Sequence, residues 1–223
     1  MQPNVQINRN MSRLLAFGCS NTYGESLPDN HHLPFNAQPS RYAWPAVLAD
    51  LTGRKCVNLG KGGTSNKKIC YDIQNFQYEK DDLVVILWTY HNRSCILNKD
   101  TDKIIRLIHS DIGQSSPPLP AGTPQKITKL YYKMFENEYD SWYDMYCRIN
   151  LAKSYLDSID IRHRHFLTDD FQQTDLGEPV WNTVSFATID MPLHCKKDRA
   201  LDNLHPGIES HKSIANEIYA KLK

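Results

Sequence analysis

The segment from Asp82 to Trp88, DLVVILW, constrains the fold of this chain more than any other segment. Every residue after Asp82 in this run is apolar. A strand with one face in water alternates apolar and polar side chains, whereas a strand buried on both faces is apolar throughout, as in the centre of a parallel sheet. Parallel neighbours need long crossover connections, usually helices. The segment therefore predicts an α/β architecture.

Strand and helix signals alternate on both sides of this segment. We expect further strands at residues 12–17, 55–59 and 165–168, and helices at 42–51, 65–76, 96–108, 126–160 and 210–222. Gly53 ends the first helix, and Ser65 or Asn66 caps the second. This alternation predicts a three-layer α/β/α sandwich around a central parallel sheet.

The length of the chain, 223 residues, suits one sizeable domain. We expect residues 1–10, which are polar and unpatterned, to form a flexible extension, and 11–223 to form a single domain. Residues 96–160 are longer than a minimal connection needs, so we expect an insertion or lid there at the substrate-binding rim.

Composition argues against several classes of partner. Lys and Arg number 26 against 25 Asp and Glu, so no global basic field indicates a nucleic-acid partner. The chain has neither a signal-peptide core nor a run of about 20 apolar residues, and we expect a cytoplasmic protein without a membrane partner. The six cysteines form no close pair, which predicts reduced thiols rather than disulfides or a zinc site: Cys19, Cys56, Cys70, Cys95, Cys147 and Cys195.

Candidate functional residues follow the ends of three predicted strands. Ser20 follows the first strand, Gly62 and Gly63 follow the second, and His91 and Asn92 follow the third. Because ligands bind at the carboxyl ends of the strands in open parallel sheets, we expect these residues to lie at one edge.

A serine and a histidine far apart in the chain complete the pattern. A serine hydroxyl is a poor nucleophile until a base removes its proton. In the segment DNLHPG, His205 has a carboxylate, Asp202, three residues before it, which can fix the tautomer and orientation of the ring. The competing interpretation is a helix-start turn in which Asp202 caps backbone N–H groups and His205 is solvated.

Four short blocks, FGCSNTYG, NLGKGGTS, TYHN and DNLHP, occur in the order seen in the SGNH, or GDSL-type, hydrolase family, which the chain resembles. The resemblance implies a flavodoxin-like α/β/α fold, a nucleophile at Ser20, a base at His205 oriented by Asp202, and a backbone oxyanion donor at Gly63. It also implies a small acyl ester as substrate, often an acetyl group on a sugar or a short-chain lipid ester, with no metal or organic cofactor.

Two blocks depart from the family pattern. Cys19 stands where an aspartate usually precedes the nucleophile, and the third block places Thr89 and His91 where the family has glycine and asparagine. We therefore expect an oxyanion hole made by the backbone N–H groups of Ser20 and Gly63 and the side chain of Asn92, with His91 or Thr89 as alternatives. The next residue, Arg93, is a candidate for binding a substrate anion, against the alternative of an arginine paired at the rim of the sheet.

Together these features predict a serine esterase or acylhydrolase acting on a small-molecule or carbohydrate ester. Two alternatives remain open at this point. An O-acyltransferase would use the same residues with an alcohol in place of water, and a non-catalytic binding module would retain the scaffold of a decayed hydrolase.

Overall fold

The computed structural model describes residues 12–34, 36–98, 103–107, 125–167 and 197–222. Its elements, in chain order, are β1 (Arg13–Gly18), α1 (Ser20–Tyr23), α2 (Trp44–Thr52), β2 (Lys55–Asn58), α3 (Asn66–Gln74), β3 (Leu83–Trp88), β4 (Ser94–Asn98), β5 (Lys103–Leu107), α4 (Gln125–Met134), α5 (Glu138–Ser158), β6 (Arg162–Leu167) and α7 (Ile208–Leu222).

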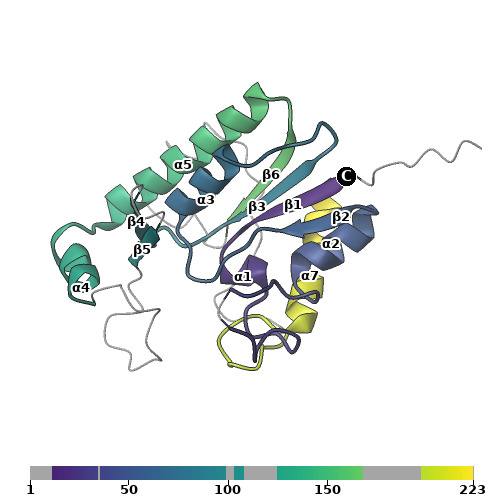
Figure 1. The fold of residues 1–223 in the computed structure, drawn as a ribbon, viewed down its shortest axis with the longest axis horizontal. Helices are drawn as coiled ribbons and strands as arrows, with labels where there is room; N and C mark the ends of the chain where they lie inside the picture. The colour runs from purple at the N-terminus through teal and green to yellow at the C-terminus, as the bar shows by residue number, and fades with distance from the viewer. Residues whose placement is uncertain (1–11, 35, 99–102, 108–124, 168–196, 223) are drawn as a thin grey trace, which may run out of the picture.

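The main sheet is parallel and has the strand order β2-β1-β3-β6. The apolar strand β3 lies between β1 and β6, where Val84 pairs with Leu15 on one side and His163 on the other. Helices α3 and α5 cover one face of this sheet, and α2 and α7 cover the other (Figure 1). The predicted three-layer α/β/α sandwich is confirmed.

Side chains that alternate along the strands form two separate cores. Leu15 and Phe17 of β1 point toward α3 and α5, whereas Leu14 and Ala16 point toward α2 and α7. The same alternation divides β3, because successive side chains of a strand lie on opposite faces. Trp142 of α5 and Trp44 of α2 are among the larger side chains buried on the two faces. This two-sided burial explains why β3 is apolar along its whole length.

Two of the predicted helices are wrong in extent or type. Residues 96–108 were expected to be helical, but β4 and β5 pair there as an antiparallel ladder in which Cys95 faces Arg106. The sequences SCILN and KIIRL contain β-branched residues, which favour strands. The single helix expected over 126–160 is two helices, and α5 begins after Asn137, whose side chain accepts a hydrogen bond from the N–H of Asp140 at 2.7 Å.

Residues 96–160, where an insertion or lid is expected, include elements on the main sheet and elements apart from it. Helix α5 packs on the main sheet through Met145, Ile149 and Leu156, whereas β4 and β5 form a separate two-stranded sheet. The proposed extension, residues 1–10, lies outside the described residues. Within the described ranges, no helix has the length and apolar character needed to cross a bilayer.

Candidate active site

Ser20 begins the short helix α1 directly after the first strand. Gly18 ends β1, and a Cβ at this position would lie 2.0 Å from Thr22 Oγ1 and 2.8 Å from the carbonyl oxygen of Leu87. Only glycine fits there, so Gly18 allows the chain to turn tightly from the strand into the helix. The Ser20 side chain is 5 % exposed, and its Oγ lies 4.0 Å from Cys19 Sγ.

Asp202 and His205 form a direct pair in the loop before α7. His205 Nδ1 lies 2.5 Å from Asp202 Oδ2, while Asp202 Oδ1 accepts hydrogen bonds from the backbone N–H groups of Leu204 at 2.9 Å and His205 at 3.0 Å. Asp202 therefore caps the turn and also orients the ring, so the two interpretations of this segment are compatible. The pair fixes the tautomer of neutral His205 with its proton on Nδ1, which leaves Nε2 free to accept a proton.

The carboxylate of Asp202 stays ionised well into the acid range. Partial burial alone would raise its pKa, but hydrogen bonds from the backbone of His205, the ring of His205, the backbone of Leu204 and the side chain of Ser26 together lower the pKa to about 2. Donors that bind the charged form of a carboxylate favour that form. Asp202 therefore keeps its negative charge at neutral pH.

Backbone contacts close the loop that presents His205. The N–H of Ala200 donates to the carbonyl oxygen of His205 at 2.9 Å. Asp198 accepts hydrogen bonds from the N–H groups of Glu209 and Ser210 at the start of α7, at 3.0 and 2.8 Å. The loop is thus tied both to itself and to the first turn of a helix that packs on the main sheet.

The same loop is attached to the segment that follows α1. The N–H of Leu201 donates to the carbonyl oxygen of Ser26 at 3.1 Å, and Ala200 packs with Leu27 and Ala43. These contacts bring the Asp202–His205 pair beside the chain that leads out of Ser20. Within the described part of the chain, however, no hydrogen bond joins Ser20 Oγ to His205.

The glycine turn after β2 carries Gly63, the predicted oxyanion donor. Gly63 has φ of 65°, in the left-handed region. In the two residues before it, the N–H of Gly62 donates to Asn36 Oδ1 at 2.8 Å, and the N–H of Lys61 donates to the carbonyl oxygen of Gly18 at 3.1 Å. The N–H of Gly63 has no acceptor among the described residues, so it remains available to a ligand.

The three candidates of the third block lie in different surroundings. Thr89 is fully buried, and its hydroxyl accepts a hydrogen bond from Arg93 Nη1 at 3.1 Å. The ring of His91 stacks on Trp142 with centroids 4.0 Å apart. Asn92 is partly buried, and its carbonyl oxygen accepts a hydrogen bond from the Tyr132 hydroxyl at 2.6 Å.

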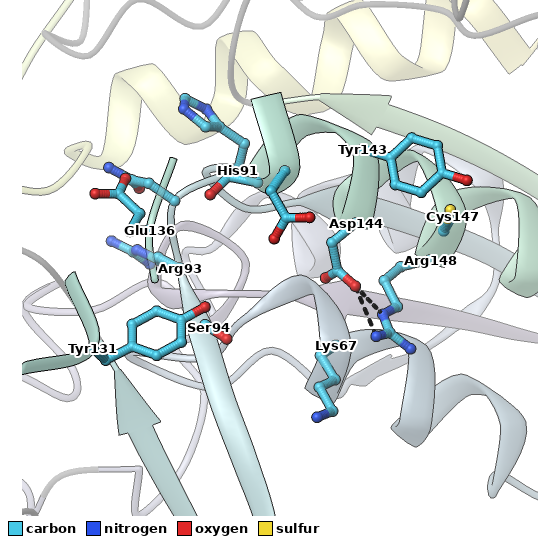
Figure 2. Close-up of a pocket in the computed structure, with 13 residues that line it drawn as sticks. Lys67, His91, Arg93, Ser94, Tyr131, Glu136, Tyr143, Asp144, Cys147 and Arg148 are labelled. Atoms are coloured by element: carbon cyan, nitrogen blue, oxygen red, sulfur yellow. Dashed lines mark hydrogen bonds and ion pairs between the residues drawn. The ribbon is translucent and has the colours of Figure 1, made fainter. Parts of the chain in front are cut away.

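A pocket of about 320 Å³ opens on the side of the third block that faces α4 and α5 (Figure 2). Asn92, Arg93 and Ser94 line one side, and residues of α4, α5 and the segment between them line another. Charged groups of both signs contribute to it, including Lys67, Arg93, Arg148, Glu136, Asp140 and Asp144. Asp144 and Arg148 form an ion pair at 2.7 Å. The lining is therefore polar, and Arg93 faces it while its guanidinium also lies over the ring of Tyr90.

Three residues at this edge of the sheet are not among the predicted site residues. Ser26 and Asn36 lie in the segment between α1 and α2, and they contact Asp202 and Gly62. Asn66 was considered only as a helix cap, but Ser65 is the cap and Asn66 is the first residue of α3. Within the described ranges, no three His, Cys, Asp or Glu side chains are grouped as a metal site requires.

No protein-family model matches this sequence, and no curated protein sequence matches it. Solved structures resemble it at low sequence identity. One of them is 15 % identical, with a TM-score of 0.50 over 95 % of this chain and 97 % of that chain. A member of the lipolytic protein G-D-S-L family from Veillonella parvula is 11 % identical, with a TM-score of 0.47 over 94 % of this chain and 97 % of that chain.

A structure that concerns the active site of a carbohydrate esterase, with divergent catalytic and non-catalytic binding functions, is 11 % identical, with a TM-score of 0.49 over 95 % of this chain and 64 % of that chain. At such identities the likeness concerns the fold alone. The chain has a parallel, three-layer α/β/α fold, and the solved proteins that it resembles in this respect include lipolytic proteins of the G-D-S-L family.

Proposed function

We propose that this protein is a serine esterase that hydrolyses small acyl esters through Ser20, His205 and Asp202. The observation that carries the proposal is the Asp202–His205 contact of 2.5 Å, on a loop attached at Ser26 to the segment following Ser20. A helix-start turn needs a capping carboxylate but has no need of a histidine on its second oxygen. A serine, a histidine and an aspartate in these roles form an acyl-transfer triad.

In the proposed reaction, Ser20 Oγ attacks the carbonyl carbon of the ester while its proton passes to His205 Nε2. The carbonyl π electrons move to the oxygen and form a tetrahedral oxyanion. When the carbon–oxygen bond to the alcohol breaks, His205 returns the proton to the leaving alkoxide, and an acyl-enzyme remains. Water then attacks this acyl group with His205 again as base, and the acid is released as the proton returns to Ser20.

The oxyanion is stabilised by three proposed donors: the backbone N–H groups of Ser20 and Gly63 and the side-chain amide of Asn92. Asn92 is preferred over its neighbours because of their contacts. Thr89 is fully buried and its hydroxyl accepts a hydrogen bond from Arg93, and the His91 ring stacks on Trp142. The amide of Asn92 has no hydrogen-bond partner among the residues that the structure describes.

The polar pocket next to Asn92 is the proposed site for the part of the substrate that does not react. Its lining of charged groups, hydroxyls and Tyr131 suits a polar alcohol portion, such as a carbohydrate, better than a long acyl chain. Arg93 is the proposed contact for an anionic group of the substrate.

The proposal is tested by intact-mass spectrometry after treatment with a fluorophosphonate, together with p-nitrophenyl acetate turnover. We expect one adduct on the wild-type protein, none on Ser20→Ala, and strongly slowed labelling on His205→Ala. The control is Ser158→Ala, because Ser158 is exposed at the end of α5 and its hydroxyl donates to the carbonyl oxygen of Tyr155. A wild-type protein that forms no adduct and turns over no faster than Ser20→Ala contradicts the proposal.

A binding module is the second candidate, and one observation favours it. His91, at the family's asparagine position, stacks on Trp142 at 4.0 Å, so that position supplies a contact to α5. If the wild-type protein forms no fluorophosphonate adduct but binds an ester or its alcohol saturably, this result identifies a binding module. An O-acyltransferase forms the same adduct, and acyl transfer to an added alcohol in preference to water identifies it.

A further inference from the structure

The side chain of Asn66 joins two loops at the carboxyl end of the sheet. Asn66 is the first residue of α3 and is 1 % exposed. Its Nδ2 donates to the carbonyl oxygens of Thr89 at 3.1 Å and Tyr90 at 3.3 Å, and its Oδ1 accepts from the N–H of Thr89 at 2.9 Å. One carboxamide therefore satisfies both polar groups of the Thr89 backbone.

Among the described residues, Thr89 has no strand partner, and these contacts take the place of one. The ladder between β3 and β6 ends at Trp88, and the ladder between β3 and β1 ends one residue earlier, at Leu87. Thr89 is fully buried, so without Asn66 its N–H and carbonyl groups would lack both strand partners and water. Asn66 extends the hydrogen bonding of β3 by one residue and fixes the direction in which the chain leaves the strand.

The residue type is specific to this arrangement. Only a carboxamide of this length can accept from an N–H and donate to two carbonyl groups at once. An aspartate has the same shape but would place carboxylate oxygens against two carbonyl oxygens. An alanine would leave the backbone groups of Thr89 unpaired in the interior.

The two segments that Asn66 joins are those assigned to the oxyanion hole. Asn66 follows Gly63 by three residues, and Thr89 precedes Asn92 by three residues. Asn36 also contacts this turn, where its Oδ1 accepts a hydrogen bond from the N–H of Gly62. The turn and the start of the third block are therefore connected through one buried side chain.

Resting on the proposed esterase function, we propose that Asn66 is a positioning residue that holds the Gly63 N–H and the Asn92 side chain in the relation needed to bind one oxyanion. Asn66 does not touch the reacting atoms. It acts through the Thr89 backbone and the first turn of α3. Its loss should therefore weaken the stabilisation of the transition state more than the binding of the substrate.

The test compares wild type with Asn66→Ala and Asn66→Asp, using p-nitrophenyl acetate kinetics. We expect kcat to fall by about 10- to 100-fold in both variants while KM changes by less than about 3-fold, because misplacing oxyanion donors weakens transition-state stabilisation. Asn66→Asp preserves volume, so a matching loss assigns the effect to the hydrogen bonds. The control is Asn75→Ala, which removes an exposed side-chain hydrogen bond to the Tyr71 carbonyl at the other end of α3.

Hydrogen exchange measured by mass spectrometry gives a readout that does not depend on activity. In Asn66→Ala and Asn66→Asp, peptides covering residues 60–66 and 88–93 should both exchange faster, while peptides from α2 and α7 stay unchanged. If Asn66→Ala does not fold, the comparison rests on Asn66→Asp, which keeps the volume of the side chain and the acceptor for the N–H of Thr89.

The outcomes separate this inference from the proposed function. An active, fluorophosphonate-labelled wild type with unchanged kcat in the Asn66 variants overturns the positioning role and leaves the esterase proposal intact. Equal changes in KM and kcat, or faster exchange throughout the protein, assign Asn66 a general structural role and also overturn the inference. A wild type without adduct or turnover overturns both proposals.

Discussion

His165 Nε2 lies 3.0 Å from His163 Nδ1, and the direction of this hydrogen bond is fixed at both of its ends. The indole N–H of Trp88 donates to His165 Nδ1 at 3.1 Å, so His165 carries its proton on Nε2 and donates it to His163. His163 Nε2 then donates to Asp157 Oδ1 at 2.9 Å. A single chain of hydrogen bonds thus runs from the buried end of β3 to the surface of α5.

Acid should destabilise the protein through two buried histidines. Burial lowers the pKa of His165 to about 3 and that of His211 to about 4, from 6.5. Because the unfolded chain binds these protons first, the stabilisation is complete above about pH 6.5 and is lost as the pH falls toward the folded-state values, by up to about 1.4 kcal/mol per pH unit for each group.

Urea denaturation at pH 7 and pH 5 measures this slope. We expect His165→Asn to lose close to half of the pH dependence, since asparagine offers Trp88 an acceptor that does not titrate. A variant with the slope of wild type shows that His165 is not responsible.

Replacing Asp202 by asparagine should impair catalysis more than stability. The amide cannot fix His205 with its proton on Nδ1, so we expect kcat for p-nitrophenyl acetate to fall by about 10³- to 10⁴-fold with little change in KM. Asp198→Asn is the matched control, because Asp198 caps α7 without contacting His205. Comparable kcat values in the two variants contradict the role assigned to Asp202.

Two glycines with nearly the same positive φ allow a controlled test of the turn that contains Gly63. Gly63 and Gly53 have φ of 65° and 63°, and a Cβ on Gly53 meets nothing within 4 Å. Alanine at either position should cost about 1–2 kcal/mol of stability from backbone strain. Only Gly63→Ala should also lower kcat, which steady-state kinetics on both variants measures. An equal kcat for the two variants removes Gly63 from the proposed site.

Arg13 pairs with two carboxylates of very different exposure. Replacing each of them in turn tests how burial affects the strength of an ion pair. Arg13 Nε and Nη2 donate to the buried carboxylate of Asp82 at 2.8 and 2.6 Å, whereas Glu79, 64 % exposed, lies 3.0 Å from Nη1. Asp82→Asn should lower the free energy of unfolding by about 2–4 kcal/mol. Glu79→Gln should lower it by less than about 1 kcal/mol. Thermal and urea denaturation measure both, and similar losses would show that burial does not decide the strength of this pair.

The sequence predicts the layers of this fold well because its central strand is buried on both faces. DLVVILW has the composition of such a strand, and Asp202 and His205 are three residues apart, a spacing that lets the two groups meet in a tight turn. The β4–β5 ladder was missed because short apolar runs such as KIIRL suit a helix or a strand until a partner strand is known.

The third block shows a different limit. Whether His91 faces Ser20 or α5 depends on Trp142, which comes much later in the chain, and nothing local to TYHN records that contact. The role of Asn66 is hidden for the same reason, since its partners Thr89 and Tyr90 belong to another element. The contacts of side chains that bridge loops are determined by tertiary packing rather than by local propensity.

The loop that carries His205 contacts Ser26 and continues into α7, which packs against α2. During synthesis, Ser20 leaves the ribosome well before its proposed base, which follows 185 residues later in the chain. Until the segment from Asp202 to His205 is made, the serine lacks this base. In the proposed enzyme, activity would therefore report that α7 has docked, and a chain cut before Asp202 would retain the serine but not the means to activate it.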